Sequence, residues 1–446
     1  MSENRYTKED IIRRAEEEDV EFVRLQFPDI FGVLKNLAIT VSQLEKALNN
    51  EIGFDGASID GFGEMAKTDL FLRPDLDTFE IFPWRPQQGK VARLICNVFN
   101  ADGTPYVADT RMVLKKVVKQ AAEMGYVFKV EPECEFFLFH IDDGGMPTTI
   151  THEHAGYFDV GPVDFAENVR RDIVLNLEEM GFEVRSSHHE KAPGQHEIDF
   201  KYSDALKTAD NLLTFKMTVK SIAKRHGLHA TFMPKPRSNV DGSGMHVNMS
   251  LWDRDGNNVF YDPEDPCKIS REARCFMAGI LKHIGAITAL TNPLINSYKR
   301  LVPGFDAPVY ATWSAETSFA LLRVPAVTGT HTKLELRSPD PTANPYLAFA
   351  ACLAAGLEGI RQELPLAPSV DINVSALTDE ERRALDIERL PKTMCDAVDA
   401  LEQDPFIIDM MGEPVAKQYI ATKRKEWNTY RRQVTEWEIK EYLNRY

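Results

Sequence analysis

The sequence lacks the short motifs that mark several large enzyme classes. None of GxxxxGK[ST], GxGxxG, HExxH or GxSxG occurs in its 446 residues, so an enzyme of this sequence is none of the types that these patterns mark. No run approaches 18 consecutive apolar residues, and the opening residues MSENR do not have the form of a signal peptide. We therefore expect no membrane association.

Cysteine is scarce, and basic residues are outnumbered by acidic ones. The six cysteines form no CxxC pair, which is typical of reduced thiols packed in the core of a cytoplasmic protein. The formal net charge is −16. Because such a chain repels phosphate backbones and anionic lipid headgroups, neither nucleic acid nor a membrane is expected as its main partner.

Length and pattern predict two domains of the α+β class. A chain of this length is too long for one ordinary domain. Strands are expected at 21–27, 33–39 and 90–99, with a boundary near 104 after the turn at 100–105. The later segment mixes helices and strands without regular alternation, which favours α+β. Its expected helices lie at 113–125, 169–181, 209–226, 271–290, 346–364 and 417–446, and its expected strands at 246–252 and 332–338.

In the stretch EPECEFFLF at 131–139, Glu133 and Glu135 stand two apart, directly before the apolar run 136–139 of an expected buried strand. Strand alternation puts Glu133 and Glu135 on one face, where they repel each other unless a cation lies between them. Further candidate donors contain no thiolate, so the set suits Mg²⁺ or Mn²⁺ better than Zn²⁺ or an iron–sulfur cluster. These donors are Glu190, Glu197, His246 and Glu335.

Carboxylate-bound Mg²⁺ commonly also binds nucleotide phosphates, which need cations beside them. The candidate cations are Arg300, Arg323 and Arg337, the last on the same strand face as Glu335. The Gly- and Pro-rich segments 54–62 and 298–308 are candidates for mobile loops over such a site.

Taken together, these motifs resemble type I glutamine synthetase over nearly the whole chain. The motifs are FDGASIDGF, PECEFFLF, AGYFD, SHHEKAPGQHEIDF, HATFMPKP, GSGMHVNMS, NSYKRLVPGFDAP and ELRSPDPTANPYLAF. The resemblance implies a β-grasp N-terminal domain at 1–104 and a catalytic domain with a curved, mainly antiparallel sheet at 105–446. It also implies two stacked hexameric rings with active sites between subunits, and ATP-dependent formation of glutamine from glutamate and ammonium through γ-glutamyl phosphate.

The resemblance further implies a role for each motif residue. Two or more Mg²⁺ or Mn²⁺ ions are implied per site, one bound by Glu135, Glu190 and Glu197 and another by Glu133, His246 and Glu335. Asp55 would reach into the neighbouring subunit's site to bind ammonium and help take its proton. The implied substrate residues are Ser58, Tyr157, Glu190, Gly242, His246, Arg300 and Arg337, the nucleotide residues are Ser250, Arg323 and Lys333, and the catalytic residues are Asp55, Arg300, Asp306 and Arg323.

Several positions depart from the family pattern near the chemistry. Asp306 stands where the flap usually carries a glutamate, and Ser318 where an arginine over the transferring phosphoryl group is expected. Asp241 replaces an asparagine, and Arg185 stands where a nucleotide-side glutamate is common. The other departures are Lys333 in place of an arginine, Glu64 in place of an arginine linked to feedback, and the absence of a tyrosine at 371–377.

These departures leave two alternatives beside an ordinary glutamine synthetase. One is a γ-glutamyl amide ligase that uses another amine or acid, because the shorter Asp306 leaves room beside the amine. The other is a weakly active paralogue with a regulatory role. The six metal-binding side chains and Asp55 favour the ordinary enzyme.

Overall fold

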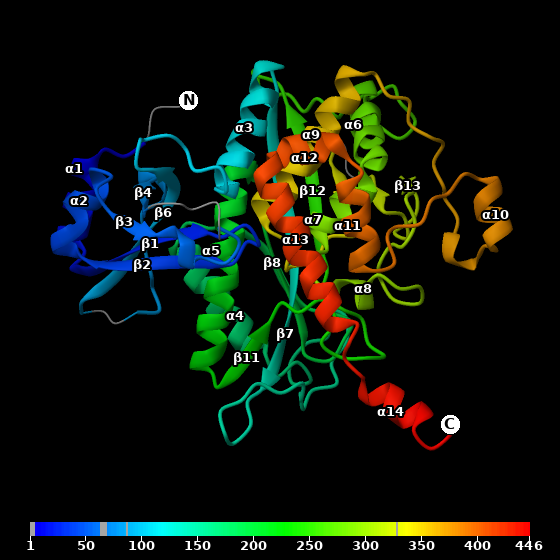
Figure 1. Cartoon of the computed structure of the whole chain (residues 1–446), viewed down its shortest axis with the longest axis horizontal. Coiled ribbons are helices and arrows are strands. Elements are labelled where there is room, and N and C mark those ends of the chain that lie inside the picture. Colours follow the sequence, from blue (N-terminus) through cyan, green and yellow to red (C-terminus); the bar gives the residue numbers. More distant parts are fainter. Residues whose placement is uncertain (1–4, 63–68, 86–87, 327–328) are drawn as a thin grey trace.

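The computed structural model describes residues 5–62, 69–85, 88–326 and 329–446. A small N-terminal domain, blue in Figure 1, lies beside a larger domain that contains most of the helices. The first holds a six-stranded sheet and the second a nine-stranded sheet, so the predicted α+β class is confirmed. The predicted boundary after residue 104 falls between the last strand of the small sheet and the helix that follows it, and stays a prediction.

The smaller sheet is built on a parallel pair of long strands, β1 (Val20–Pro28) and β6 (Lys90–Asn100). β2 (Leu34–Thr40) pairs antiparallel with β1, and β4 (Asp69–Pro74) pairs antiparallel with β6. The three strands predicted for this region from sequence are therefore confirmed. The shorter elements are α1 (Lys8–Glu17), α2 (Leu44–Leu48), β3 (Gly53–Asp55) and β5 (Glu80–Ile81).

The larger sheet is centred on the long strand β7 (Val127–His140), which carries the two paired glutamates. β7 pairs antiparallel with β12 (Met245–Trp252) on one side and with β9 (Gln195–Phe200) on the other. Among the described strands of this sheet, every pairing is antiparallel except that between β13 and β14, so the sheet is mainly antiparallel, as expected. The remaining strands are β8 (Val184–His189), β10 (Ser203–Asp204), β11 (Leu228–Thr231), β13 (Trp313–Ser314), β14 (Leu322–Arg323) and β15 (Leu334–Leu336).

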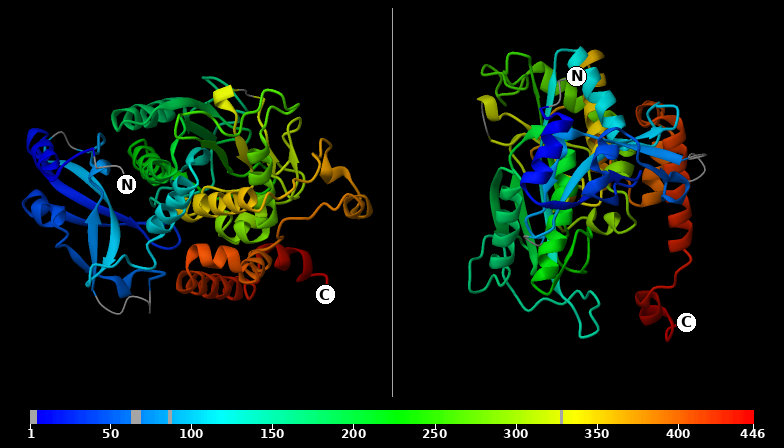
Figure 2. Two further views of the ribbon diagram at one scale, coloured as in Figure 1. Left: turned by 90° about the horizontal axis from the view of Figure 1, so that it is seen from above. Right: turned by 90° about the vertical axis from the view of Figure 1, so that its left-hand side faces the viewer.

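Helix α9 (Pro345–Arg361) forms the centre of the helical layers, and all but its last two residues are buried. Figure 2 shows this gold helix between the larger sheet and the orange and red C-terminal helices. The predicted helix at 417–446 is two helices, which are separated by residues 431–435. The other helices are α3 (Thr110–Glu123), α4 (Glu167–Glu179), α5 (Ala205–Arg225), α8 (Ser297–Arg300), α10 (Asp379–Ala384), α11 (Met394–Glu402), α12 (Pro405–Met411), α13 (Glu413–Tyr430) and α14 (Glu436–Tyr442).

The single helix predicted at 271–290 is broken at His283. α6 (Arg271–Lys282) and α7 (Ile284–Thr291) meet there at an angle of 75°. The imidazole at the break lies 2.6 Å from Asp404 through Nδ1 and 2.6 Å from Glu358 through Nε2. Among the described residues, no single helix is long and apolar enough to span a membrane, and α6 with α7 passes that test only as a bent pair, by length and composition alone.

A buried arginine joins the two domains. Arg111, at the start of α3, is 1% exposed and donates to both carboxylate oxygens of Asp210 at 2.9 and 2.8 Å. It also donates to Asp75 at 2.7 Å and to Asn97 at 2.9 Å, both in the N-terminal domain. Because a buried guanidinium needs partners for its charge and its donors, this network holds the small domain against the larger one.

Candidate active site

Strand register gathers the predicted donors on one face of the larger sheet. Glu133 of β7 lies opposite His246 of β12, and Glu135 lies opposite Glu197 of β9. Glu335 of β15 lies opposite a β12 residue two places beyond His246. Directly opposed residues point to the same face, and so do residues two apart. Four adjacent strands therefore bring side chains from distant parts of the sequence together.

The predicted metal set of Glu133, His246 and Glu335, called the first metal set from here on, converges. Donor atoms of Glu133, His246 and Glu335 all lie within 4.8 Å of one another. His246 Nδ1 is 3.4 Å from a Glu133 oxygen and 3.3 Å from a Glu335 oxygen. Burial raises the pKa of Glu133, but the hydrogen bond and charge of His246, with Lys333 and Arg185, outweigh it and lower the pKa to about 2. Glu133 is thus held as a carboxylate.

The second predicted set is only partly together. Glu190 and Glu197 form a group with His188, whose Nδ1 is 3.5 Å from Glu190 and whose Nε2 is 3.8 Å from Glu197. Glu135 instead accepts hydrogen bonds of 2.8 Å from Gln195 Nε2 and of 2.8 Å from the Gly244 amide. His188 was not predicted, although it stands two residues before the predicted ligand Glu190 in the sequence. In the structure it lies opposite Glu197 in the β8–β9 pairing.

Crowding of carboxylates makes this second region unfavourable without a cation. Burial and the neighbouring Glu190 raise the pKa of Glu135 to about 7. Burial, Asp199 and Glu135 raise the pKa of Glu197 well above its ordinary value. Each shift reports that a negative charge at that position needs either a proton or a cation nearby. The chemistry of the donors therefore fits a divalent ion with oxygen ligands.

A third cluster with metal-ligand residue types is a structural network. Glu153, His189 and His196 are buried with their donor atoms within 4.8 Å of one another. Arg170 Nη1 lies 3.0 Å from His196 Nδ1, and because arginine can only donate, His196 must carry its proton on Nε2. That nitrogen is therefore not free to bind a metal. His189 Nε2 bonds Glu153 at 2.7 Å, and its Nδ1 lies 2.6 Å from the Glu190 carbonyl, which fixes the backbone of a predicted ligand.

Two of the three predicted arginines contact Glu335, and the third bonds the backbone beyond it. Arg323 Nη1 and Arg337 Nε each lie 3.1 Å from a Glu335 oxygen. Arg300 is 1% exposed, and its Nη atoms donate to the carbonyl oxygens of Arg337 and Ser338 at 3.1 and 2.7 Å. Its Nε is buried without a hydrogen-bond partner among the described residues. Arg300 thus holds the backbone that directly follows β15, the strand that carries Glu335.

The predicted flap lies over the site and is held by charged groups. The Asp306 carboxylate pairs with Lys191 and lies 3.2 Å from Arg337 Nη2. Its amide donates to the Asp241 carboxylate at 3.0 Å, so the aspartate that replaces the expected asparagine contacts the backbone of the flap. Burial raises the pKa of Asp306, but Arg337 and Lys191 outweigh it and lower the pKa to about 2. Lys235 Nζ lies 3.3 Å from the centroid of the Phe305 ring.

Gly242 occupies a position that excludes a side chain. A Cβ there would overlap the carbonyl oxygen of Pro234. The Gly242 carbonyl accepts a hydrogen bond of 3.1 Å from Gln195 Nε2, the same group that donates to Glu135. The glycine therefore lets this loop approach the second carboxylate set closely.

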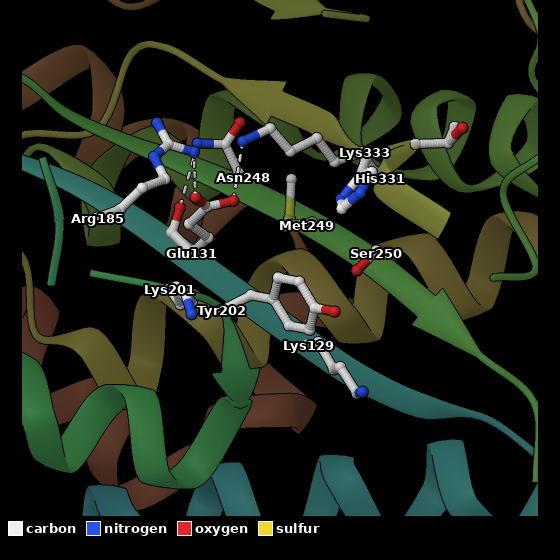
Figure 3. Close-up of a pocket in the computed structure, with 11 residues that line it drawn as sticks. Lys129, Glu131, Arg185, Lys201, Tyr202, Asn248, Met249, Ser250, His331 and Lys333 are labelled. Atoms are coloured by element: carbon white, nitrogen blue, oxygen red, sulfur yellow. Dashed lines mark hydrogen bonds and ion pairs between the residues drawn. The ribbon is translucent and has the colours of Figure 1, made fainter. Parts of the chain in front are cut away.

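A pocket of about 250 Å³ opens beside the first metal set. It is lined by Ser250 and Lys333, two of the three predicted nucleotide residues; Arg323 is not among its lining residues. Figure 3 shows Arg185 and Lys333 reaching the Glu131 carboxylate from opposite sides. The lining contains four permanent cations and one carboxylate. In a chain of net charge −16, this local excess of cations favours an anionic ligand.

Three predicted residues lie apart from these groups or at their edge. Asp55 and Ser58 are exposed at the end of β3 in the N-terminal domain, where Asp55 accepts hydrogen bonds from Ala57 and Ser58 at 2.9 and 2.8 Å. Tyr157 is 52% exposed, and its ring lies 5.7 Å from the ring of His188. Ser318 is exposed. Glu64 lies outside the described residues.

Comparison with known proteins agrees with this arrangement over both domains. The family model described as "Glutamine synthetase, catalytic domain" matches residues 107–442, and that described as "Glutamine synthetase, beta-Grasp domain" matches residues 19–101. The chain belongs to the glutamine synthetase family.

Similar proteins match along their whole length. Glutamine synthetase of Clostridium saccharobutylicum is 56% identical over 99% of this chain and 100% of its own. That of Staphylococcus epidermidis is 51% identical over 100% of both chains. Among solved structures, a GmaS/ADP complex has a TM-score of 0.89 and 33% identity, covering 98% of this chain and 99% of its own. Plasmodium falciparum glutamine synthetase has a TM-score of 0.86 and 26% identity, covering 99% of both.

Proposed function

We propose that this protein forms glutamine from glutamate and ammonia, using ATP to convert the γ-carboxylate to γ-glutamyl phosphate. The observation that carries the proposal is the convergence of Glu133, His246 and Glu335 beside a cation-lined pocket. Full-length similarity to proteins named glutamine synthetase supports it. The γ-carboxylate is a poor electrophile, and phosphorylation supplies a good leaving group, so the site must bind nucleotide and acid side by side.

The donor set fits two or more Mg²⁺ or Mn²⁺ ions. Glu133, His246 and Glu335 would bind one ion, and Glu190 and Glu197, joined by Glu135, would bind another. The raised pKa values of Glu135 and Glu197 support a cation at the second position. When bound, the metals would act as Lewis acids that neutralise phosphate charge.

The side chains around Glu335 would bind the acid substrate. Arg337 has two carboxylate partners, Glu335 and Asp306, and a substrate carboxylate could replace the second. The buried Nε of Arg300 has no hydrogen-bond partner within the part of the chain that the structure describes. Gly242 would allow the substrate backbone to approach, and Arg323 would face the transferring phosphoryl group, whose charge it would stabilise.

Ammonium would be bound by a group of anionic and polar side chains. Asp306 in the flap, Glu190 and Tyr157 belong to the larger domain, whereas Asp55 and Ser58 lie on the N-terminal domain. A carboxylate cluster first attracts the cation and then accepts its proton. The flap would keep water from hydrolysing the acyl phosphate.

The separation of Asp55 from the larger sheet supports a site shared between subunits of a homo-oligomer, expected to be a dodecamer of two hexameric rings. The test is complementation between Asp55→Asn and Glu190→Gln. Each variant should be inactive alone, and a reassembled mixture should regain activity, because some sites would combine an intact Asp55 with an intact Glu190. No recovery in mixed oligomers would place Asp55 outside a shared site.

Ammonia is the favoured acceptor over other amines. The glutamine synthetases of Clostridium saccharobutylicum and Staphylococcus epidermidis are 56% and 51% identical to this chain, compared with 33% for GmaS. The evidence for a γ-glutamyl amide ligase is the shorter Asp306 in the flap. The evidence for a weakly active regulatory paralogue is Ser318 at the place of the expected arginine. The six retained metal-binding side chains argue against loss of catalysis. The free cysteines, four of them buried, support a cytoplasmic location.

The test is ATP- and Mg²⁺-dependent release of phosphate with glutamate and ammonium, compared with a panel of amines. We expect glutamine and phosphate in equal amounts, with ammonium the best acceptor. Product formed only with a larger amine would show that ammonium is not the acceptor. Bound ATP without phosphate release for any pair would support the weakly active paralogue.

A further inference from the structure

Arg185 stands between the pocket and the first metal set, at an irregular point of β8. In the β8–β9 pairing, Val184 lies opposite Phe200 and Ser186 opposite Asp199, so Arg185 is the extra residue of a bulge. A bulge redirects the side chains beside it. Here Arg185 turns onto the face of the sheet that carries the donor groups and lines the pocket.

Three carboxylates surround this guanidinium at different distances. Nη1 bonds Glu131, which is 6% exposed and whose other oxygen accepts from Lys333 Nζ at 2.8 Å. Nη2 is 3.5 Å from Glu133 and 3.7 Å from Asp199, too far for strong hydrogen bonds. Glu131 therefore orients the group, while Nη2 keeps hydrogen-bonding capacity.

The orientation of Arg185 leaves it available to a ligand. Its side chain is 43% exposed, compared with 17% for Lys333. A guanidinium has five donors in a planar fork that matches the oxygens of a phosphate group. The other two pocket cations face elsewhere: Lys129 lies 4.2 Å from the centroid of the Trp252 ring, and Lys201 pairs with Glu183 at 2.8 Å.

We propose that Arg185, oriented by Glu131, binds a phosphate oxygen of the nucleotide. The proposal rests on the proposed function, since it takes the ligand to be ATP or ADP. It gives Arg185 a direct binding role and Glu131 a positioning role. A cation at this position would add positive charge beside the phosphates in a chain that has Ser318 at the place expected for a phosphoryl-side arginine.

The test is calorimetric binding of ATP, ADP and adenosine in the presence of Mg²⁺. Arg185→Gln should lower the affinity for ATP and ADP roughly ten- to a hundredfold, the range for loss of a charge-assisted hydrogen bond. It should leave the affinity for adenosine unchanged. Arg185→Lys should retain part of the ATP affinity. Glu131→Gln should lower the affinity for ATP and ADP, again without changing the affinity for adenosine. Arg171→Gln, at an exposed position of α4, is the matched control and should bind all three ligands like the wild type.

Circular dichroism and thermal unfolding would establish that each variant is folded. An ATP affinity in folded Arg185→Gln equal to that of the wild type would overturn the proposal. An equal loss of affinity for adenosine in this variant would also overturn the proposal, because adenosine has no phosphate. If the wild type binds ATP but makes no glutamine, the ligase assignment fails and this test still decides the role of Arg185. If it makes glutamine but Arg185→Gln binds ATP normally, only the present proposal fails.

Discussion

Replacing Glu335 by glutamine is the most informative single change in the site. The substitution keeps the shape of the side chain and removes its charge. Three groups face that charge: Arg323 Nη1 at 3.1 Å, Arg337 Nε at 3.1 Å and His246 Nδ1 at 3.3 Å. The change would also remove one of the three donors of the first metal set.

The expected effect follows from these two losses. Groups that merely orient metal ligands affect metal affinity by about 10- to 100-fold, so loss of a direct donor should weaken Mn²⁺ binding by about 100-fold or more. The two arginines would lose the acceptor that aligns them, and removal of one preorganised charge-stabilising group costs roughly 10²–10³ in rate. We expect a loss of glutamine formation of at least that size.

The assay pairs Mn²⁺ titration by calorimetry with the rate of glutamine formation. Glu123→Gln is the control, because Glu123 is an exposed residue of α3 whose side chain is 64% accessible. It should match the wild type in both measurements. Wild-type Mn²⁺ affinity and rate in folded Glu335→Gln would refute the assignment of this residue as a metal ligand.

Three further predictions concern the scaffold. Arg111→Met should lower the free energy of unfolding by about 3–5 kcal/mol in urea titrations, since Asp210 would lose its buried partner; a change under about 1 kcal/mol would contradict the domain-locking role. Burial disfavours a charged His283, but its two carboxylate partners raise the pKa of this residue above its ordinary value. Its stabilising contribution is therefore complete below about pH 6.5 and lost as pH rises through the raised pKa; His283→Gln should remove that decline, and an unchanged pH–stability curve would exclude the charged pair. Gly242→Ala should reduce glutamine formation, because its Cβ would overlap a backbone carbonyl; wild-type kinetics would show that the loop can move aside.

Local patterns were enough to predict much of the sheet and part of the site. Alternation within EPECEFFLF placed Glu133 and Glu135 on one face, and the structure agrees. The resemblance grouped Glu133 with His246 and Glu335, and these residues come from three adjacent strands. The roles assigned to them stay predictions.

Contacts between distant segments explain what sequence reasoning missed. Nothing local at 271–290 reveals that His283 meets Glu358 and Asp404, 75 and 121 residues away, and the helix breaks where they meet. Similarly, Asp306 is held by Lys191, 115 residues away. Such pairs depend on the tertiary fold, which periodicity within one segment does not report.

The most direct test of the site is anomalous diffraction from crystals grown with Mn²⁺ and a non-hydrolysable ATP analogue. One peak should lie at coordination distance, roughly 2.1 Å, from Glu133, His246 and Glu335, beside the terminal phosphate. A second should lie among Glu135, Glu190 and Glu197. Peaks elsewhere, or nucleotide bound with no metal at either set, would contradict the account.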